Sequence, residues 1–207
     1  ENGQGKAKHA RLKLYGAPVF YLPYAQFPIG DQRQSGFLFP KLADTNTGAD
    51  IALPYYLNLA PNLDATLSAR YKAKHGYLTE AEARWLNRFD RWTVGGSYIE
   101  SDDNFNKQSR WLVSAEERGR LGDHFTTSIN YTKVSDTEYF RDLNTTSLSI
   151  NRASSLSQSF NARYQTLDWD IGSSIQLYQS IDPSQEIDEA PYEQLPTVWL
   201  HYRPAAR

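Results

Sequence analysis

The chain has 207 residues, a formal net charge of −2 and neither cysteine nor methionine. The missing cysteines exclude disulfides and thiolate metal ligands within this sequence, and the near-neutral charge with scattered basic residues gives no sign of a nucleic-acid partner. No apolar run approaches the roughly 18 residues of a membrane-spanning helix. A transmembrane strand need not contain a long apolar run, because only one of its faces meets lipid. The aromatic content of 14% is typical of such strands.

The first 29 residues predict a small β-layer. Apolar and polar residues alternate over residues 10–15, and residues 19–24 form a second short extended run. A loop by composition follows at residues 30–33 and predicts a junction. The chain opens at Glu1 without a signal peptide, so we interpret it as a fragment of a mature protein.

From Gly36 onward the sequence repeats one pattern, in which about ten alternating residues are followed by a turn. The clearest run is 62–71, and others occupy 77–85, 92–98, 110–117, 124–134, 169–179 and 197–202. The pattern predicts an all-β, antiparallel fold of roughly ten strands, either a barrel or a large sandwich. Residues 145–167 are compatible with a hairpin or one strand, and we expect one strand.

Charged residues in the middle of the predicted strands favour the barrel. A dry sandwich core does not tolerate unpaired charges, although a sandwich could turn them to solvent, whereas a wide barrel accepts them in a water-filled interior. Short turns at 60–62, 87–90 and 118–123 also fall on one side, opposite longer connections at 44–50, 72–76, 100–109 and 135–144. This asymmetry is typical of outer-membrane barrels. The residues predicted to line the interior are Asp64, Arg70, Glu80, Glu82 and Arg84.

Two prolines, Pro40 and Pro54, fall inside the first two strand-like runs after the junction. Proline has no N–H to give to a neighbouring strand, so it belongs at edges, strand ends or bulges. The pair predicts a weakly bonded line between consecutive strands, although both residues could simply mark strand ends.

Three segments resemble a known family. The runs PVFYLPYAQFPIGDQRQSGFLFP (18–40), LPYYLNLAPNLDATL (53–67) and YTKVSDTEYFRDL (131–143) are similar, in order and spacing, to the LptD family of lipopolysaccharide-assembly outer-membrane proteins. The similarity covers most of the chain and is weakest after about Asn144.

The resemblance implies an architecture and a function. Residues 1–29 would be the last strands of a periplasmic jelly-roll, 30–35 a junction, and 36–207 the first part of a large barrel in the Gram-negative outer membrane. The barrel would insert lipopolysaccharide into the outer leaflet, with a lipoprotein plug (LptE), an LptA-like periplasmic bridge and membrane lipid as partners. No cofactor is expected.

The resemblance also implies roles for individual residues. A lateral gate would include Pro40 and Pro54. The acyl chains would pass the jelly-roll interior, although plain core packing explains the same residues, and Asp31 and Arg33 at the junction could pair or be solvated. The residues expected along the acyl-chain path are Leu12, Leu14, Val19, Phe20, Leu22 and Phe27.

Other functions find less support in the sequence. The four histidines, His9, His75, His124 and His201, have neither metal-ligand spacing nor a G-x-S-x-G neighbour, so no catalytic residue, metal site or enzyme activity is predicted. A passive outer-membrane porin or receptor channel explains the alternation and the loop asymmetry equally well. It gives no reason for the prolines or the first β-layer. A soluble sugar-binding sandwich is a third alternative.

Overall fold

The computed structural model describes residues 4–14, 17–28, 33–45, 48–143, 155–181 and 194–204. Strands dominate these residues, and the only helix in them has four residues, so the described chain contains no helix that could cross a membrane. The all-β, antiparallel fold predicted from the sequence is confirmed. The elements are β1 (Gln4–Leu14), β2 (Ala17–Pro28), β3 (Gly36–Phe37), β4 (Lys41–Thr45), β5 (Gly48–Ala60), β6 (Leu63–Lys72), β7 (Gly76–Leu86), β8 (Asp90–Ile99), β9 (Arg110–Leu121), β10 (Phe125–Val134), α1 (Tyr139–Asp142), β11 (Ser155–Gln165), β12 (Trp169–Ser180) and β13 (Gln194–Tyr202).

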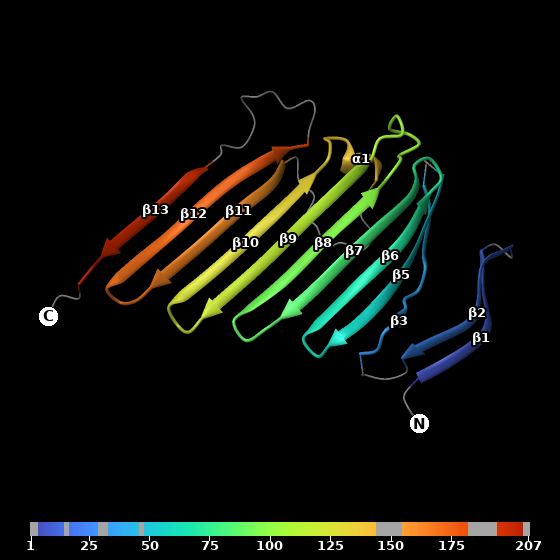
Figure 1. Ribbon diagram of the computed structural model, residues 1–207, viewed down its shortest axis with the longest axis horizontal. Coiled ribbons are helices and arrows are strands. Elements are labelled where there is room, and N and C mark those ends of the chain that lie inside the picture. The colour runs from blue at the N-terminus through green and yellow to red at the C-terminus, as the bar shows by residue number, and fades with distance from the viewer. Residues whose placement is uncertain are drawn as a thin grey trace.

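The strands form two antiparallel sheets. β1 and β2 pair only with each other among the described strands, and β5 to β13 lie side by side in chain order (Figure 1). β3 and β4 both pair with the free side of β5. Because these two share one edge, the eleven strands of the larger sheet occupy ten positions, as the sequence predicts.

The two ends of the large sheet differ. Tight turns at 61–62, 87–89, 122–124 and 166–168 lie at one end, which we call the turn end. Residues 73–75, 100–109 and 135–143 lie at the other, the loop end (Figure 1). The expected turn at 118–123 is shorter, because β9 continues to Leu121. Of the expected strand 145–167, residues 145–154 lie outside the described part, and the rest is β11 and a turn.

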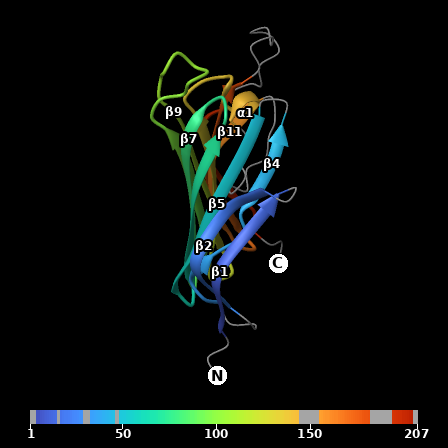
Figure 2. The ribbon, with the colours of Figure 1, turned by 90° about the vertical axis from the view of Figure 1, so that its right-hand side faces the viewer.

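The strand alternation separates the large sheet into two faces. We call the face that packs against α1 the inner face and the opposite one the outer face; Figure 2 shows α1 at the loop end. Large apolar side chains are exposed on the outer face, among them Tyr77, Trp85, Tyr98 and Val113. Because successive residues of a strand point to opposite faces, this division follows directly from the sequence pattern.

The main apolar cluster lies on the inner face at the loop end. Tyr139 and Phe140 of α1, with Leu143 just after it, pack on residues from five strands. Each of the eight residues is at most 8% exposed, so α1 is packed against the sheet rather than projecting from it. The strand residues of this cluster are Leu78, Ile99, Leu112, Val134 and Leu156.

Candidate functional site

All five charged residues predicted to line the interior lie on the inner face. Glu80, Glu82 and Arg84 stand opposite Ser68, Thr66 and Asp64 across β6 and β7. Asp64, Arg70 and Glu80 are buried beneath other side chains, at 5%, 2% and 0% exposure. Glu82 is half-buried and Arg84 is exposed, so the inner face contains both buried and solvated charges.

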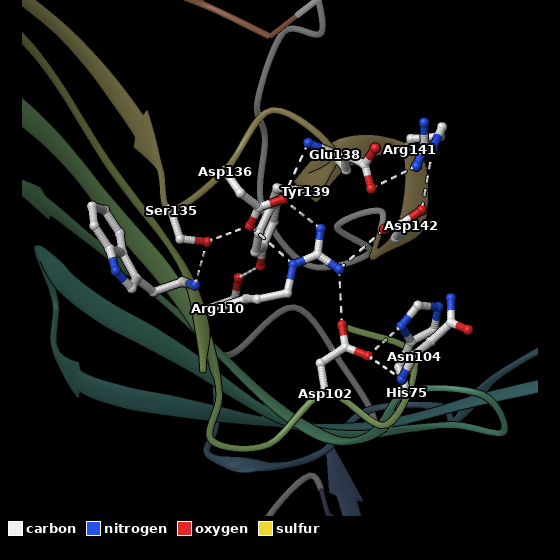
Figure 3. A network of polar contacts seen from close by, with 12 residues as sticks. His75, Asp102, Asn104, Arg110, Ser135, Asp136, Glu138, Tyr139, Arg141 and Asp142 are labelled. Carbon is white, nitrogen blue, oxygen red and sulfur yellow. Dashed lines mark hydrogen bonds and ion pairs between the residues drawn. The ribbon is translucent and has the colours of Figure 1, made fainter. Parts of the chain in front are cut away.

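Arg110, at the start of β9, holds three carboxylates at the loop end (Figure 3). Its Nη1 donates to Asp102 at 2.8 Å and to Asp142 at 3.1 Å. Its Nε and Nη2 donate to the two oxygens of Asp136 at 2.9 and 2.7 Å. The Arg110 side chain is fully buried, and a planar guanidinium is the group suited to such a forked arrangement. Arg110 therefore joins a loop, a strand and the segment that carries α1.

Two of these carboxylates have further partners. Asp102 lies 2.8 Å from Nδ1 of the buried His75 and accepts the backbone N–H of Asn104. Asp136 accepts the hydroxyl of Ser135. Burial alone would raise the pKa of Asp136, but hydrogen bonds from Arg110 and Ser135 hold that pKa below its ordinary value.

A second buried arginine fastens the far end of the α1 segment. Arg70 donates from Nε to Asp50 at 2.7 Å and from Nη1 to Glu80 at 2.9 Å. It also donates to the backbone carbonyl of Leu143 at 3.1 Å. The segment after β10 is thereby tied to β5, β6 and β7, which lie several strands away.

Tyr139 makes a further polar contact between α1 and the sheet. Its hydroxyl lies within hydrogen-bonding distance of Ser97 on β8, and burial raises the pKa of Tyr139 to about 12. Together, the two arginines, this hydroxyl and the apolar cluster make residues 135–143 a cap over the inner face at the loop end. We call these residues the cap.

The first strand of the large sheet is interrupted where it passes Pro54. β3 and β4 pair with β5 in registers that differ by one residue. The residues between them, 38–40, therefore lie opposite only Leu53 and Pro54, and the extra residue makes a bulge. Phe39, in this break, is 94% exposed. We call the line between β3–β4 and β5 the seam.

Both prolines predicted to form a gate lie at this seam. The Pro54 carbonyl accepts the N–H of Leu38 at 2.9 Å. Because the N–H and C=O of a strand residue point to the same side, the donor that Pro54 lacks would also have faced the first strand. Pro40 lies in the break before β4 rather than inside a strand. Pro54 therefore removes one donor from the seam, and Pro40 removes the N–H of a residue in the adjoining break.

Arg33, which the sequence places in the predicted junction, is tied to the large sheet. It donates to the hydroxyl of Tyr56 at 2.8 Å and to the carbonyl of Pro61 at 3.1 Å, and it pairs with Asp64. Asn58 donates to the backbone carbonyl of Arg33 at 2.8 Å. The other predicted junction residue, Asp31, lies outside the described residues. Among the described residues, the acidic partner of Arg33 is Asp64.

Replacing Arg33 with alanine should loosen the junction without unfolding the sheet. Arg33 is about half exposed, and Asp64 keeps two bonds from Arg84, so the free energy of unfolding should fall by only ~1 kcal/mol. Amide hydrogen exchange at 33–35 and Asn58 should become several times faster. Arg88→Ala, at an exposed turn, is the control, and unchanged exchange in R33A would contradict the tie.

The residues predicted along the acyl-chain path belong to β1 and β2. Their side chains lie outside the described part of the structure: Leu12, Leu14, Val19, Phe20, Leu22 and Phe27.

Sequence reasoning missed the cap and the residues that hold it. Loop carboxylates such as Asp102 and Asp136 look like ordinary solvated charges in a sequence. One signal was present, because the apolar residues of 139–143 recur at positions i, i+1 and i+4, which is a helical spacing in a chain otherwise built of strands. Among the described residues, no group of three or more His, Asp or Glu is arranged to hold a metal ion.

Comparison with known proteins connects this geometry to one family. A family model described as LPS transport system D matches residues 108–206. The chain is similar to an LPS-assembly protein LptD of Hahella chejuensis, with 38% identity over 206 residues that cover 96% of this chain and 26% of the relative. LPS-assembly proteins LptD of Chromohalobacter salexigens and Aliivibrio fischeri are each 36% identical, over 95% and 94% of this chain and 25% and 24% of their own lengths. The chain thus spans about a quarter of the curated relatives it matches.

Proposed function

Since the chain belongs to the LptD family, we propose that it forms part of a protein that transports lipopolysaccharide and inserts it into the outer leaflet of the Gram-negative outer membrane. In this proposal residues 1–29 end a periplasmic jelly-roll, 30–35 are the junction, and 36–207 begin an outer-membrane β-barrel. The acyl chains travel along the jelly-roll strands and the head group along the inner face. An LptE-type lipoprotein plug and an LptA-like bridge protein are the proposed partners.

The outer face supports a position in a membrane. Tyr71, Tyr77 and Tyr98 lie near its loop end, and Trp85 and Trp92 near its turn end. Along β7, Tyr77 and Trp85 are eight residues apart, which is roughly 27 Å at 3.4 Å per residue. With the tilt of about 35–45° usual for strands of outer-membrane barrels, this length covers roughly 20 Å along the membrane normal, which is comparable with an apolar band of about 25 Å between two aromatic girdles.

The seam is the observation that favours transport over passive diffusion. A molecule with several acyl chains cannot leave a closed barrel sideways unless strands part. Unmade backbone hydrogen bonds cost about 1 kcal/mol net in water and several in lipid. Because Pro40 and Pro54 remove donors before any opening, they lower that cost, and we assign them to a lateral gate at the first strands. A porin has no need of such a break.

Depletion of the full-length protein tests this function. Lipopolysaccharide should accumulate inside the cell and disappear from the surface. A plasmid-borne wild-type copy of the gene should restore lipopolysaccharide at the surface. Surface labelling of lipopolysaccharide and entry of large apolar antibiotics measure the effect. Normal surface lipopolysaccharide combined with the loss of a membrane conductance would overturn the proposal in favour of a passive porin or receptor channel.

A further inference from the structure

A row of arginines crosses the inner face at the turn end, away from the cap. Arg91 on β8 and Arg118 on β9 stand directly opposite each other, and Arg120 follows two residues later on β9. The strands that carry them run side by side down to their tight turns (Figure 1).

The register places all three on the inner face. Arg91 is an even number of residues from Ser97, whose hydroxyl meets Tyr139 of the cap. Arg118 and Arg120 have the same relation to Arg110, which binds the cap. Residues an even number apart in a strand share one face, and no register shift occurs between β8 and β9.

The positive charges of this row are less fully paired with carboxylates than those of the other inner-face arginines. Arg84 is paired with Asp64, and Arg163 with Asp170. Arg118 has one exposed ion pair, with Glu116 at 2.9 Å, in which the two side chains are 70% and 50% exposed. Exposed pairs of this kind contribute little.

The two remaining arginines of the row have no carboxylate partner in the described part of the chain. The side chain of Arg120 donates only to the carbonyl of Gly122 at 3.3 Å, and the side chain of Arg91 makes no ion pair or hydrogen bond with any described residue. Three guanidinium groups thus share one carboxylate, that of Glu116. The buried arginines of the loop end, by contrast, are saturated by carboxylates and cannot accept another anion.

Like charges directly opposite each other across two strands destabilise a sheet, so an arginine pair in this register favours binding of an anion. The guanidinium fork matches the oxygens of a phosphate group and binds it in two places at once. We propose that Arg91, Arg118 and Arg120 form a binding site for the phosphate esters of the lipopolysaccharide head group. This inference rests on the proposed function and assigns the first anion contact on the inner face to the turn end, the end at which Arg33 also contacts the sheet.

The test uses the full-length protein in the membrane, with a photo-crosslinking amino acid in place of Ser128, which stands opposite Arg118 on β10. Lipopolysaccharide should crosslink at this position. In the double variant Arg91→Gln with Arg118→Gln, crosslinking should fall about tenfold, because two charge-assisted contacts are lost. Dephosphorylated lipopolysaccharide should crosslink about tenfold less to the unaltered arginines. Arg163→Gln, which removes an arginine already paired with a carboxylate, is the matched control and should leave crosslinking unchanged.

Each alternative result has a clear meaning. Equal crosslinking of the phosphorylated and dephosphorylated forms, or of the double variant and its parent, would overturn the phosphate site and leave the transport function standing. Equal crosslinking of an ordinary glycerophospholipid, or full competition by millimolar pyrophosphate, would overturn the assignment to the saccharide head group. No lipopolysaccharide crosslink anywhere on the inner face would overturn the proposed function itself. The folded fraction of each variant in the membrane, measured by protease resistance, keeps a folding defect distinct from a binding defect.

Discussion

Replacing Arg110 with methionine should lower the free energy of unfolding of the full-length protein by about 3–5 kcal/mol, the cost of removing one partner from a buried ion pair. Asp102, Asp136 and Asp142 would remain at the loop end without their shared cation. The cap would lose its main polar attachment, and residues 135–143 should become accessible to trypsin at Arg141. Urea unfolding in detergent, followed by tryptophan fluorescence, and limited proteolysis measure these two effects.

Two companion variants separate charge from packing. Arg141→Ala removes an exposed arginine of the same helix and should leave stability nearly unchanged, because exposed ion pairs contribute little. Adding Asp102→Asn and Asp136→Asn to Arg110→Met should recover part of the loss, because the uncompensated carboxylates cause it. If R110M were as stable as its parent, the cap would have to be held by apolar packing alone.

The same ion pairs make the cap sensitive to acid. The pKa of Asp136 is lowered in the folded protein, so the folded state binds its proton less tightly than the unfolded chain. The stability this carboxylate contributes is present at pH values above 3.8, the ordinary value for aspartate, and is lost as the pH falls through the lowered folded pKa. This part of the acid dependence should vanish in Asp136→Asn.

Replacing both Pro40 and Pro54 with alanine should slow the appearance of lipopolysaccharide at the cell surface. The change at Pro54 restores an N–H that faces the first strand, and the change at Pro40 restores one in the adjoining break. Each hydrogen bond that such an N–H makes stabilises the closed form by about 1 kcal/mol net. If both bonds form, opening becomes less favourable by about 2 kcal/mol, or roughly 30-fold in rate. Pulse labelling of newly made lipopolysaccharide measures the effect, and antibiotic entry gives a second readout.

The control for this double variant is Pro61→Ala, which changes a proline in the tight turn between β5 and β6, outside the seam. It leaves the carbonyl that accepts Arg33 in place. Normal export in the proline double variant, with amide exchange showing that its seam amides are protected, would mean that the seam does not limit transport. The gate assignment would then fail.

The alternation of polar and apolar residues was sufficient to predict the strands and to assign each residue to one of the two faces of the sheet. Alternation in 62–71 has a period of two, and the side-chain period of a strand is also two, so Asp64 and Arg70 had to share a face. Turn composition located the tight turns to within a few residues. The three quoted segments also pointed to the family that the comparisons support.

Only the tertiary structure decided which charges meet. Arg110 binds Asp136 and Asp142, which are 26 and 32 residues further along the chain, and no periodic pattern records contacts across such separations. The break at 38–40 depends on a one-residue difference in register between β3 and β4, and register is set by pairing across strands. The same pairing places Arg91 opposite Arg118. Sequence alone therefore determined which residues share the inner face, and the fold determined which of their charges are neutralised by a partner and which are not.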